Sequence, residues 1–188
     1  MGLNLVTKAQ YKTYANITST NMDESIDLLI PKVSEFVKSY CRRTFVDHFD
    51  QAKIETFHGG FSSLILKESP VISVSNVQYS SDFGQTYTKL TKYVDWIDDG
   101  DSIVALNPGG FTKQINGYKV TYFAGYEAVP PDLILAVYDL ITYYRRHDGS
   151  VHSARNPGSN TMQIEYISST ALPANIKRVL DLYTADYT

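Results

Sequence analysis

The chain has 188 residues, with 17 Lys and Arg against 20 Asp and Glu, which gives a formal net charge of −3. At roughly 150 residues per domain this length predicts one domain. A content of 43% hydrophobic and 20% charged residues is typical of a chain that buries a core. The charge balance excludes a strongly basic nucleic-acid binder, and a single cysteine excludes an intramolecular disulfide and a cysteine-cluster metal site. Tyrosine is unusually frequent, with 15 copies against 8 phenylalanines and one tryptophan.

No targeting segment is expected from the residue pattern. The first residues of the chain lack a basic stretch followed by an apolar one, so no signal peptide is expected. The longest apolar stretch, 133–144, is too short to span a bilayer. We therefore expect an intracellular, reducing setting.

The first part of the chain is predicted to be helical. Residues 4–17 are expected to form a short helix that Thr7 can cap. In the segment 26–45 apolar residues recur every three or four positions, with acids early and bases late, as the helix dipole favours. Pro31 lies inside this pattern and should kink the helix or mark its first turn.

Between about 49 and 126 the apolar period changes to two, which predicts a β-rich region. The expected strands are 49–57, 63–67, 72–79, 92–97, 102–106 and 117–124. The run Asp98-Asp99-Gly100-Asp101 lies between two of these strands and is typical of a hairpin turn.

A second long helix is expected to begin at Pro130-Pro131-Asp132, because proline is tolerated where a helix starts. Its core stripe is formed by Leu133, Ala136, Val137, Leu140, Ile141 and Tyr144. The opposite face is also apolar, at Ile134, Tyr138 and Tyr143, so this helix should be deeply buried or pack against a second partner.

The remainder is predicted to be a loop over 148–162, a short strand over 163–168 and a last helix that starts near Pro173. The fold class is therefore α+β. It is a small bundle of about three to four helices (helical parts about 4–45, 130–147 and 173–185) with a β-rich insertion, about 49–126, between the first and second long helices.

No motif predicts catalysis. His147 and His152 have no carboxylate at a metal-ligand spacing. The acids of 95–101 lack the terminal glutamate of a calcium loop and are expected to form a solvated hairpin tip. Cys41 lies on the apolar stripe of its helix. We expect no catalytic residue, no metal site and no cofactor.

An ordered set of motifs carries a family resemblance. Residues 64–79 read LILKESPVISVSNVQY, residues 118–126 read YKVTYFAGY, and residues 129–133 read VPPDL and open a helix that ends in YYRR at 143–146. This order resembles the head–tail connector (adaptor) proteins of tailed double-stranded DNA bacteriophages, which show L-x-L-x-x-x-P-V-x-x-V, V-x-Y-x-A-G-Y and V-P-x-x-L-x-x-A in turn.

The resemblance implies a single connector domain over 1–188 that is not an enzyme. Such proteins assemble as a ring, usually of twelve copies, beneath the portal after DNA packaging. They extend the DNA channel and dock the next neck or tail component. The implied partners are therefore other copies of the chain, the portal and that component. DNA would pass without sequence-specific binding, and no membrane would be involved. The implied location is the virion neck, after assembly in the host cytoplasm.

Two surfaces are expected on this basis. The subunit interface should lie on the second apolar face and the basic end of the helix at 130–147, at Ile134, Tyr138, Tyr143, Arg145 and Arg146. The family uses its carboxy-terminal segment against the portal. Portal docking is therefore expected at Ile176, Arg178, Val179, Leu182, Tyr183 and Tyr187.

Three other interpretations stay open. The chain could be another neck or tail component, such as a stopper or tail-completion protein. It could be a small metal-dependent hydrolase that acts through His147, His152 and the acids of 95–101. It could also be a carbohydrate-binding module, which would need its tyrosines exposed as a platform.

Overall fold

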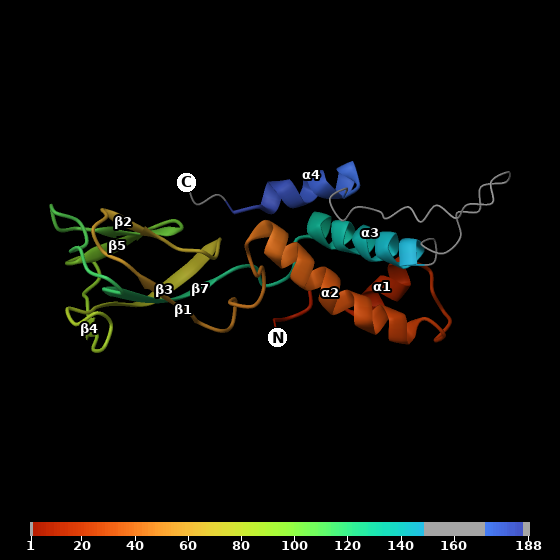
Figure 1. The fold of residues 1–188 in the computed structure, drawn as a ribbon, viewed down its shortest axis with the longest axis horizontal. Coiled ribbons are helices and arrows are strands. Elements are labelled where there is room, and N and C mark those ends of the chain that lie inside the picture. Colours follow the sequence, from red (N-terminus) through yellow and green to blue (C-terminus); the bar gives the residue numbers. More distant parts are fainter. Residues whose placement is uncertain (1, 149–171, 186–188) are drawn as a thin grey trace, which may run out of the picture. The chain divides into compact units, whose positions relative to one another are not determined.

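The computed structural model describes residues 2–148 and 172–185 and has a mixed α+β fold (Figure 1). The chain divides into two compact units. One is β-rich and consists mainly of Arg42–Val129, and the other is helical and is formed by Asn4–Cys41 with Pro130–Thr184. The expected fold class, helices with a β-rich insertion between the two long ones, is confirmed.

The helical unit contains α1 (Lys8–Tyr14), α2 (Asp23–Cys41), α3 (Pro131–Asp148) and α4 (Ala174–Tyr183). The predicted cap of the first helix is confirmed. The Thr7 hydroxyl accepts the N–H of Gln10, and the Gln10 side chain accepts the N–H of Thr7. Together they satisfy two otherwise unpaired donors. α2 continues through Pro31, so this proline does not mark the first turn.

The core of the helical unit follows from the helical spacing of its apolar residues. The most deeply buried ones are Ile26, Ile30, Val33 and Val37 on α2, Leu133, Val137, Leu140 and Ile141 on α3, and Ile176 and Leu180 on α4. Residues three or four apart share one face of a helix, so each set forms a single stripe. The two long helices pack on each other, and α4 packs on both.

The β unit is built from two antiparallel sheets. One has the order β1-β7-β3-β4, with β1 at Lys53–Phe57, β7 at Tyr118–Ala124, β3 at Val71–Tyr79 and β4 at Thr88–Lys89. The other has the order β2-β6-β5, with β2 at Ser63–Ile65, β6 at Ser102–Ala105 and β5 at Trp96–Asp99. The predicted hairpin is confirmed, since β5 pairs with β6 across Gly100-Asp101.

Three strand predictions differ from the structure. The strand expected at 49–57 begins only at Lys53. The strand expected at 92–97 begins only at Trp96, because Tyr93 has a φ of 64° and the carboxylate of Asp95 accepts the N–H of Thr91 to close a turn. β4 was not expected, because two residues are too few to show an alternating pattern.

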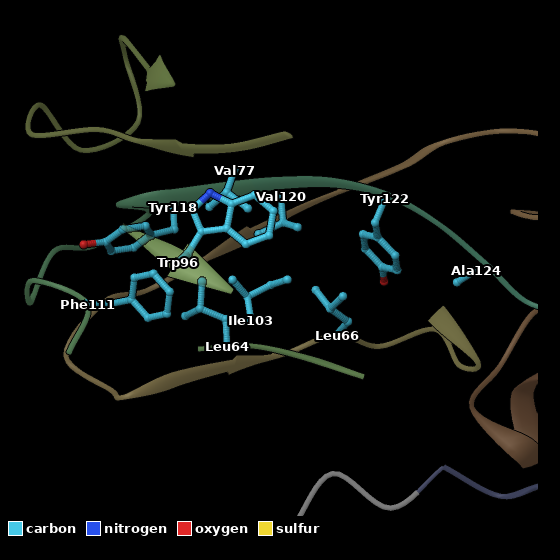
Figure 2. Packing of buried hydrophobic residues seen from close by; sticks show 10 residues of the cluster. All are labelled: Leu64, Leu66, Val77, Trp96, Ile103, Phe111, Tyr118, Val120, Tyr122 and Ala124. Carbon is cyan, nitrogen blue, oxygen red and sulfur yellow. The ribbon is translucent and has the colours of Figure 1, made fainter. Parts of the chain in front are cut away.

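The core of the β unit lies between the two sheets (Figure 2). Burial alternates strictly along β7, with Tyr118, Val120 and Tyr122 facing inward. The buried cluster consists of Leu64, Leu66, Val77, Trp96, Ile103, Phe111, Tyr118, Val120, Tyr122 and Ala124. Apolar side chains from both inner faces therefore meet in one layer, as in a β-sandwich.

One ion-pair cluster is also buried in this unit. The Nζ of Lys53 lies 2.9 Å from a carboxylate oxygen of Glu55 and 2.9 Å from one of Glu68, and these acidic side chains are only 7% and 5% exposed. Burial alone would lower the pKa of Lys53, but hydrogen bonding and attraction to the two carboxylates outweigh it and raise that pKa. Inward charges on β1 also discourage further strands from pairing at this sheet edge.

Some predictions fall outside the described residues. They are most of the loop expected at 148–162, the strand expected at 163–168, and Tyr187. In the part that the structure describes, the helices are too short or too polar to traverse a lipid bilayer.

Candidate interaction surfaces

The second apolar face of α3 is partly covered by α1 of the same chain. Tyr11 is fully buried, and its hydroxyl lies 3.0 Å from the Thr142 hydroxyl. The ring of Tyr14 stacks on Tyr138, with centroids 4.8 Å apart and an interplanar angle of 25°. Tyr138 is thus engaged inside the helical unit.

A hydrogen bond to an acid strengthens this contact. The Tyr14 hydroxyl donates to Asp139 Oδ1 at 2.8 Å. This bond, with some burial, raises the pKa of Tyr14 above the ordinary tyrosine value, because a neutral hydroxyl can donate to the carboxylate and a phenolate cannot. Two tyrosines therefore fasten α1 to α3.

The other expected interface residues do not share one face. Five residues separate Tyr138 from Tyr143, which places them about 140° apart around the helix. Tyr143 and Ile134 are half-buried. The guanidinium of Arg145 donates to Met22 Sδ at 3.4 Å, whereas Arg146 is exposed.

A neighbouring exposed residue was missed by the sequence reasoning. Leu135 is 49% exposed and lies on nearly the same side of α3 as Arg146, because a step of eleven residues is just over three full turns. The signal was present, since Leu135 is an apolar residue outside the core stripe. Leu135 and Arg146 define what we call the α3 outer stripe.

α4 is held on the long helices by two buried residues and by hydrogen bonds. Ile176 is 2% exposed and Leu180 is fully buried, so the inner side of α4 belongs to the core. The Tyr40 hydroxyl donates to Asp181 at 2.5 Å, and the Tyr183 hydroxyl donates to Asp132 at 2.6 Å. These bonds anchor the second half of α4.

The charged group at the centre of this contact is Asp181. Its pKa is lowered, first by the hydrogen bond from Lys177 at 2.7 Å and then by that from Tyr40. The pKa of Tyr40 is raised in turn, because its hydroxyl donates to the carboxylate. Asp181 therefore serves a structural role.

The expected portal-docking residues consequently divide between the two sides of α4. Ile176 and Tyr183 face the helical unit, and Val179 is half-buried. Arg178 is exposed, and Leu182 is 76% exposed. These last two define the α4 outer face, and Tyr187 lies beyond the described residues.

The acids considered for metal binding have other partners. Asp98 pairs with Lys92, and Asp101 accepts hydrogen bonds from the Ser69 hydroxyl and the Val71 N–H. Within residues 2–148 and 172–185, no group of three or more His, Cys, Asp or Glu side chains is arranged to hold a metal ion. The side chains of His147 and His152 lie outside the described part.

These features define an α+β protein whose tyrosines join its helices and whose helical outer surfaces expose leucine and arginine. The chain belongs to the head completion protein family, whose model matches residues 4–185 and so includes both units. A search of curated protein sequences finds no match.

Solved structures of gene transfer agent (GTA) particles contain chains with the same fold. A chain in "Neck of empty GTA particle computed with C6 symmetry" has a TM-score of 0.62 and 15% identity, with 100% of this chain and 97% of that chain covered. A chain in "Virion of native gene transfer agent (GTA) particle" has a TM-score of 0.62 and 14% identity, covering 98% and 91%. A chain in "Neck of native GTA particle computed with C12 symmetry" has a TM-score of 0.58 and 15% identity, covering 100% and 97%.

Proposed function

We propose that the chain is a structural protein of the phage neck, a head–tail connector that closes the filled head and links it to the tail. The observation that carries this proposal is the match of the head completion family model over residues 4–185. The fold match along nearly the full length of chains from GTA necks supports it. In this role residues 1–188 act as one connector domain and have no catalytic function.

The active form in this proposal is a ring of twelve copies. This copy number agrees with the C6 and C12 symmetries of the GTA necks whose chains share the fold. Ring contacts are heterologous, so one patch of a subunit must meet a different patch of the next. We place one such patch along the α3 outer stripe, where the exposed Leu135 and the exposed guanidinium of Arg146 lie on the same side of the helix, about three turns apart.

The ring would lie beneath the portal and extend its channel. The formal net charge of −3 gives the chain little affinity for phosphates, so DNA could slide through it. The assembly would reside in the virion neck after forming in the host cytoplasm.

We assign portal docking to the α4 outer face. Leu182 has 76% of its surface exposed next to the charged Arg178, which is an arrangement that burial against a partner would stabilise. Deleting 172–188 would be a poor test, because it also removes Ile176 and Leu180 from the core of the helical unit.

The sharper test compares two exposed leucines. The purified chain is expected to be monomeric alone and to form a ring only when mixed with portal, as measured by mass photometry. Leu182→Glu should abolish portal binding, whereas Leu28→Glu, at a leucine 58% exposed on α2, should leave it intact. Equal binding by both variants would refute the docking assignment. A stable dimer of the isolated chain would count against the connector role.

A further inference from the structure

The outer face of the three-stranded sheet carries apolar side chains in each of its rows. Strand register places Ser63, Val104 and Ile97 in one outward row, and Ile65, Ser102 and Asp99 in the next. Two further bonds, from Ala105 N–H to Ser62 O and from Leu106 N–H to Asp95 O, extend the same register. A third outward row therefore consists of Phe61, Leu106 and Asp95. We call these three rows the β2-β6-β5 outer face.

Its apolar side chains are substantially exposed. Phe61 is 63%, Ile65 47% and Leu106 43% exposed, and Ile97 and Val104 are half-buried between them. Contiguous apolar surface of this kind on a folded protein marks an interaction site.

The four-stranded sheet provides an internal comparison. One of its outward rows, formed by Thr56, Lys119 and Gln78, is polar across three strands. The next row is mixed, because Ile54, which is 63% exposed, lies beside Thr121 and Asn76. The four-stranded sheet thus has a fully polar outward row, as expected of a solvated sheet, whereas each of the three rows of the β2-β6-β5 outer face contains an apolar side chain.

The aromatic corner of this face is held in place by the backbone. The N–H of Phe111 donates to the carbonyl of Phe61 at 2.8 Å. Gly110 has a φ of 71°, and a Cβ at this position would lie 2.7 Å from that same carbonyl oxygen. Phe61 is thus presented from a fixed loop, which lowers the entropic cost of binding.

Charge indicates what kind of surface would cover the face. Its β5 side carries Asp95 and the exposed Asp99, while the nearby Lys92 pairs with Asp98 on the opposite side of the strand. A partner that matches this pattern presents apolar side chains flanked by Lys or Arg.

We propose that the β2-β6-β5 outer face docks a basic, amphipathic segment of a second neck or tail protein, distinct from the portal that the α4 outer face binds. This inference rests on the proposed function and identifies the surface that receives the component following this chain.

The test uses site-specific photo-crosslinking in assembled particles. A photoreactive benzoylphenylalanine replaces Leu106, and the matched control replaces Gln78 on the outer face of the other sheet. After irradiation, the Leu106 variant should form one covalent adduct with a different particle protein, at a peptide that contains Lys or Arg, as identified by mass spectrometry. The Gln78 variant should not form this adduct.

The remaining outcomes separate the two proposals. Absence of the chain from purified particles would overturn the proposed neck function. Three outcomes would overturn the docking proposal alone, provided that the chain is present in the particles. They are no adduct at Leu106, an adduct only with a second copy of this chain, and equal adducts from both variants. In a second arm, Asp99→Lys should lower the adduct yield about tenfold. Thr56→Lys, which adds a lysine to the outer face of the other sheet, should leave the yield unchanged. An unchanged yield in both the Asp99→Lys and the Thr56→Lys variants would show that Asp99 does not contribute to docking.

Discussion

Replacing Tyr138 by alanine removes the ring on which Tyr14 stacks and so tests whether α1 is fastened to α3 within one chain. Replacing a fully buried large aromatic residue by alanine lowers the free energy of unfolding by about 3–5 kcal/mol. For the half-buried Tyr138 we expect about 2 kcal/mol. The lost stacking at 4.8 Å adds about 0.5–1 kcal/mol. We therefore expect the free energy of unfolding to fall by about 2–3 kcal/mol.

The measurement is thermal and urea unfolding of the full chain. For a protein of this size the change corresponds to a decrease in Tm of roughly 4–12 °C. Circular dichroism at 222 nm follows the helices, and fluorescence of Trp96, the one tryptophan, follows the β unit. The transition followed by circular dichroism should shift further from that of the wild type than the transition followed by fluorescence.

The control is Leu135→Ala on the same helix, at a residue 49% exposed, which should change the free energy of unfolding by less than about 1 kcal/mol. Ring formation with portal should be impaired more by Leu135→Ala than by Tyr138→Ala, because Leu135 lies on the α3 outer stripe. A Tyr138→Ala chain that unfolds like the wild type but fails to form rings would refute the reasoning and return Tyr138 to the subunit interface.

Three further predictions follow from contacts in the two units. Lys53→Met should lower the free energy of unfolding by about 3–5 kcal/mol in urea titrations, because it leaves two buried carboxylates without their cation. Lys92→Met, at a pair about one third exposed, should lower it by less than about 1 kcal/mol. The raised pKa of Tyr14 implies that its contribution to stability is complete below pH 10 and is lost as the pH rises through the folded-state value. The gap in Tm between wild type and Tyr14→Phe should therefore narrow above about pH 10, and a constant gap would contradict the hydrogen bond. Gly110→Ala should cost at least about 1 kcal/mol through its positive φ and its contact with Phe61, while Gly109→Ala, with open space around it, should be neutral in the same assay.

Local patterns were sufficient to predict most of the fold. The helical period identified the core stripe of α3, and the polar cap at Thr7 follows from the side chain alone. The hairpin between β5 and β6 was signalled by its turn residues. Boundaries failed where a side chain reorganised the backbone, as when Asp95 closed the turn that delays β5 until Trp96.

The surfaces were harder to predict, because exposure depends on contacts between distant parts of the chain. The sequence showed that α3 has a second apolar face, but whether α1 or another molecule covers it is decided by contacts such as Tyr14 with Asp139, 125 residues apart. The sequence did contain a pattern that points to the β2-β6-β5 outer face. The consecutive apolar residues of 64–66 and 103–106 are typical of strands buried on both faces, and the structure leaves one of those faces exposed.

The excess of tyrosine has a structural explanation in the helical unit. Tyr11 and Tyr14 bond to polar groups of α3, and Tyr40 and Tyr183 join α4 to α2 and α3. α1 and α4 have only seven and ten residues, too few to be stable as isolated helices. A tyrosine buries apolar area and still makes a directed hydrogen bond, so it can hold a short helix in one orientation. Because these tyrosines are used within the chain, the surfaces left for partners are those marked by exposed leucines and Phe61, with arginine or aspartate beside them.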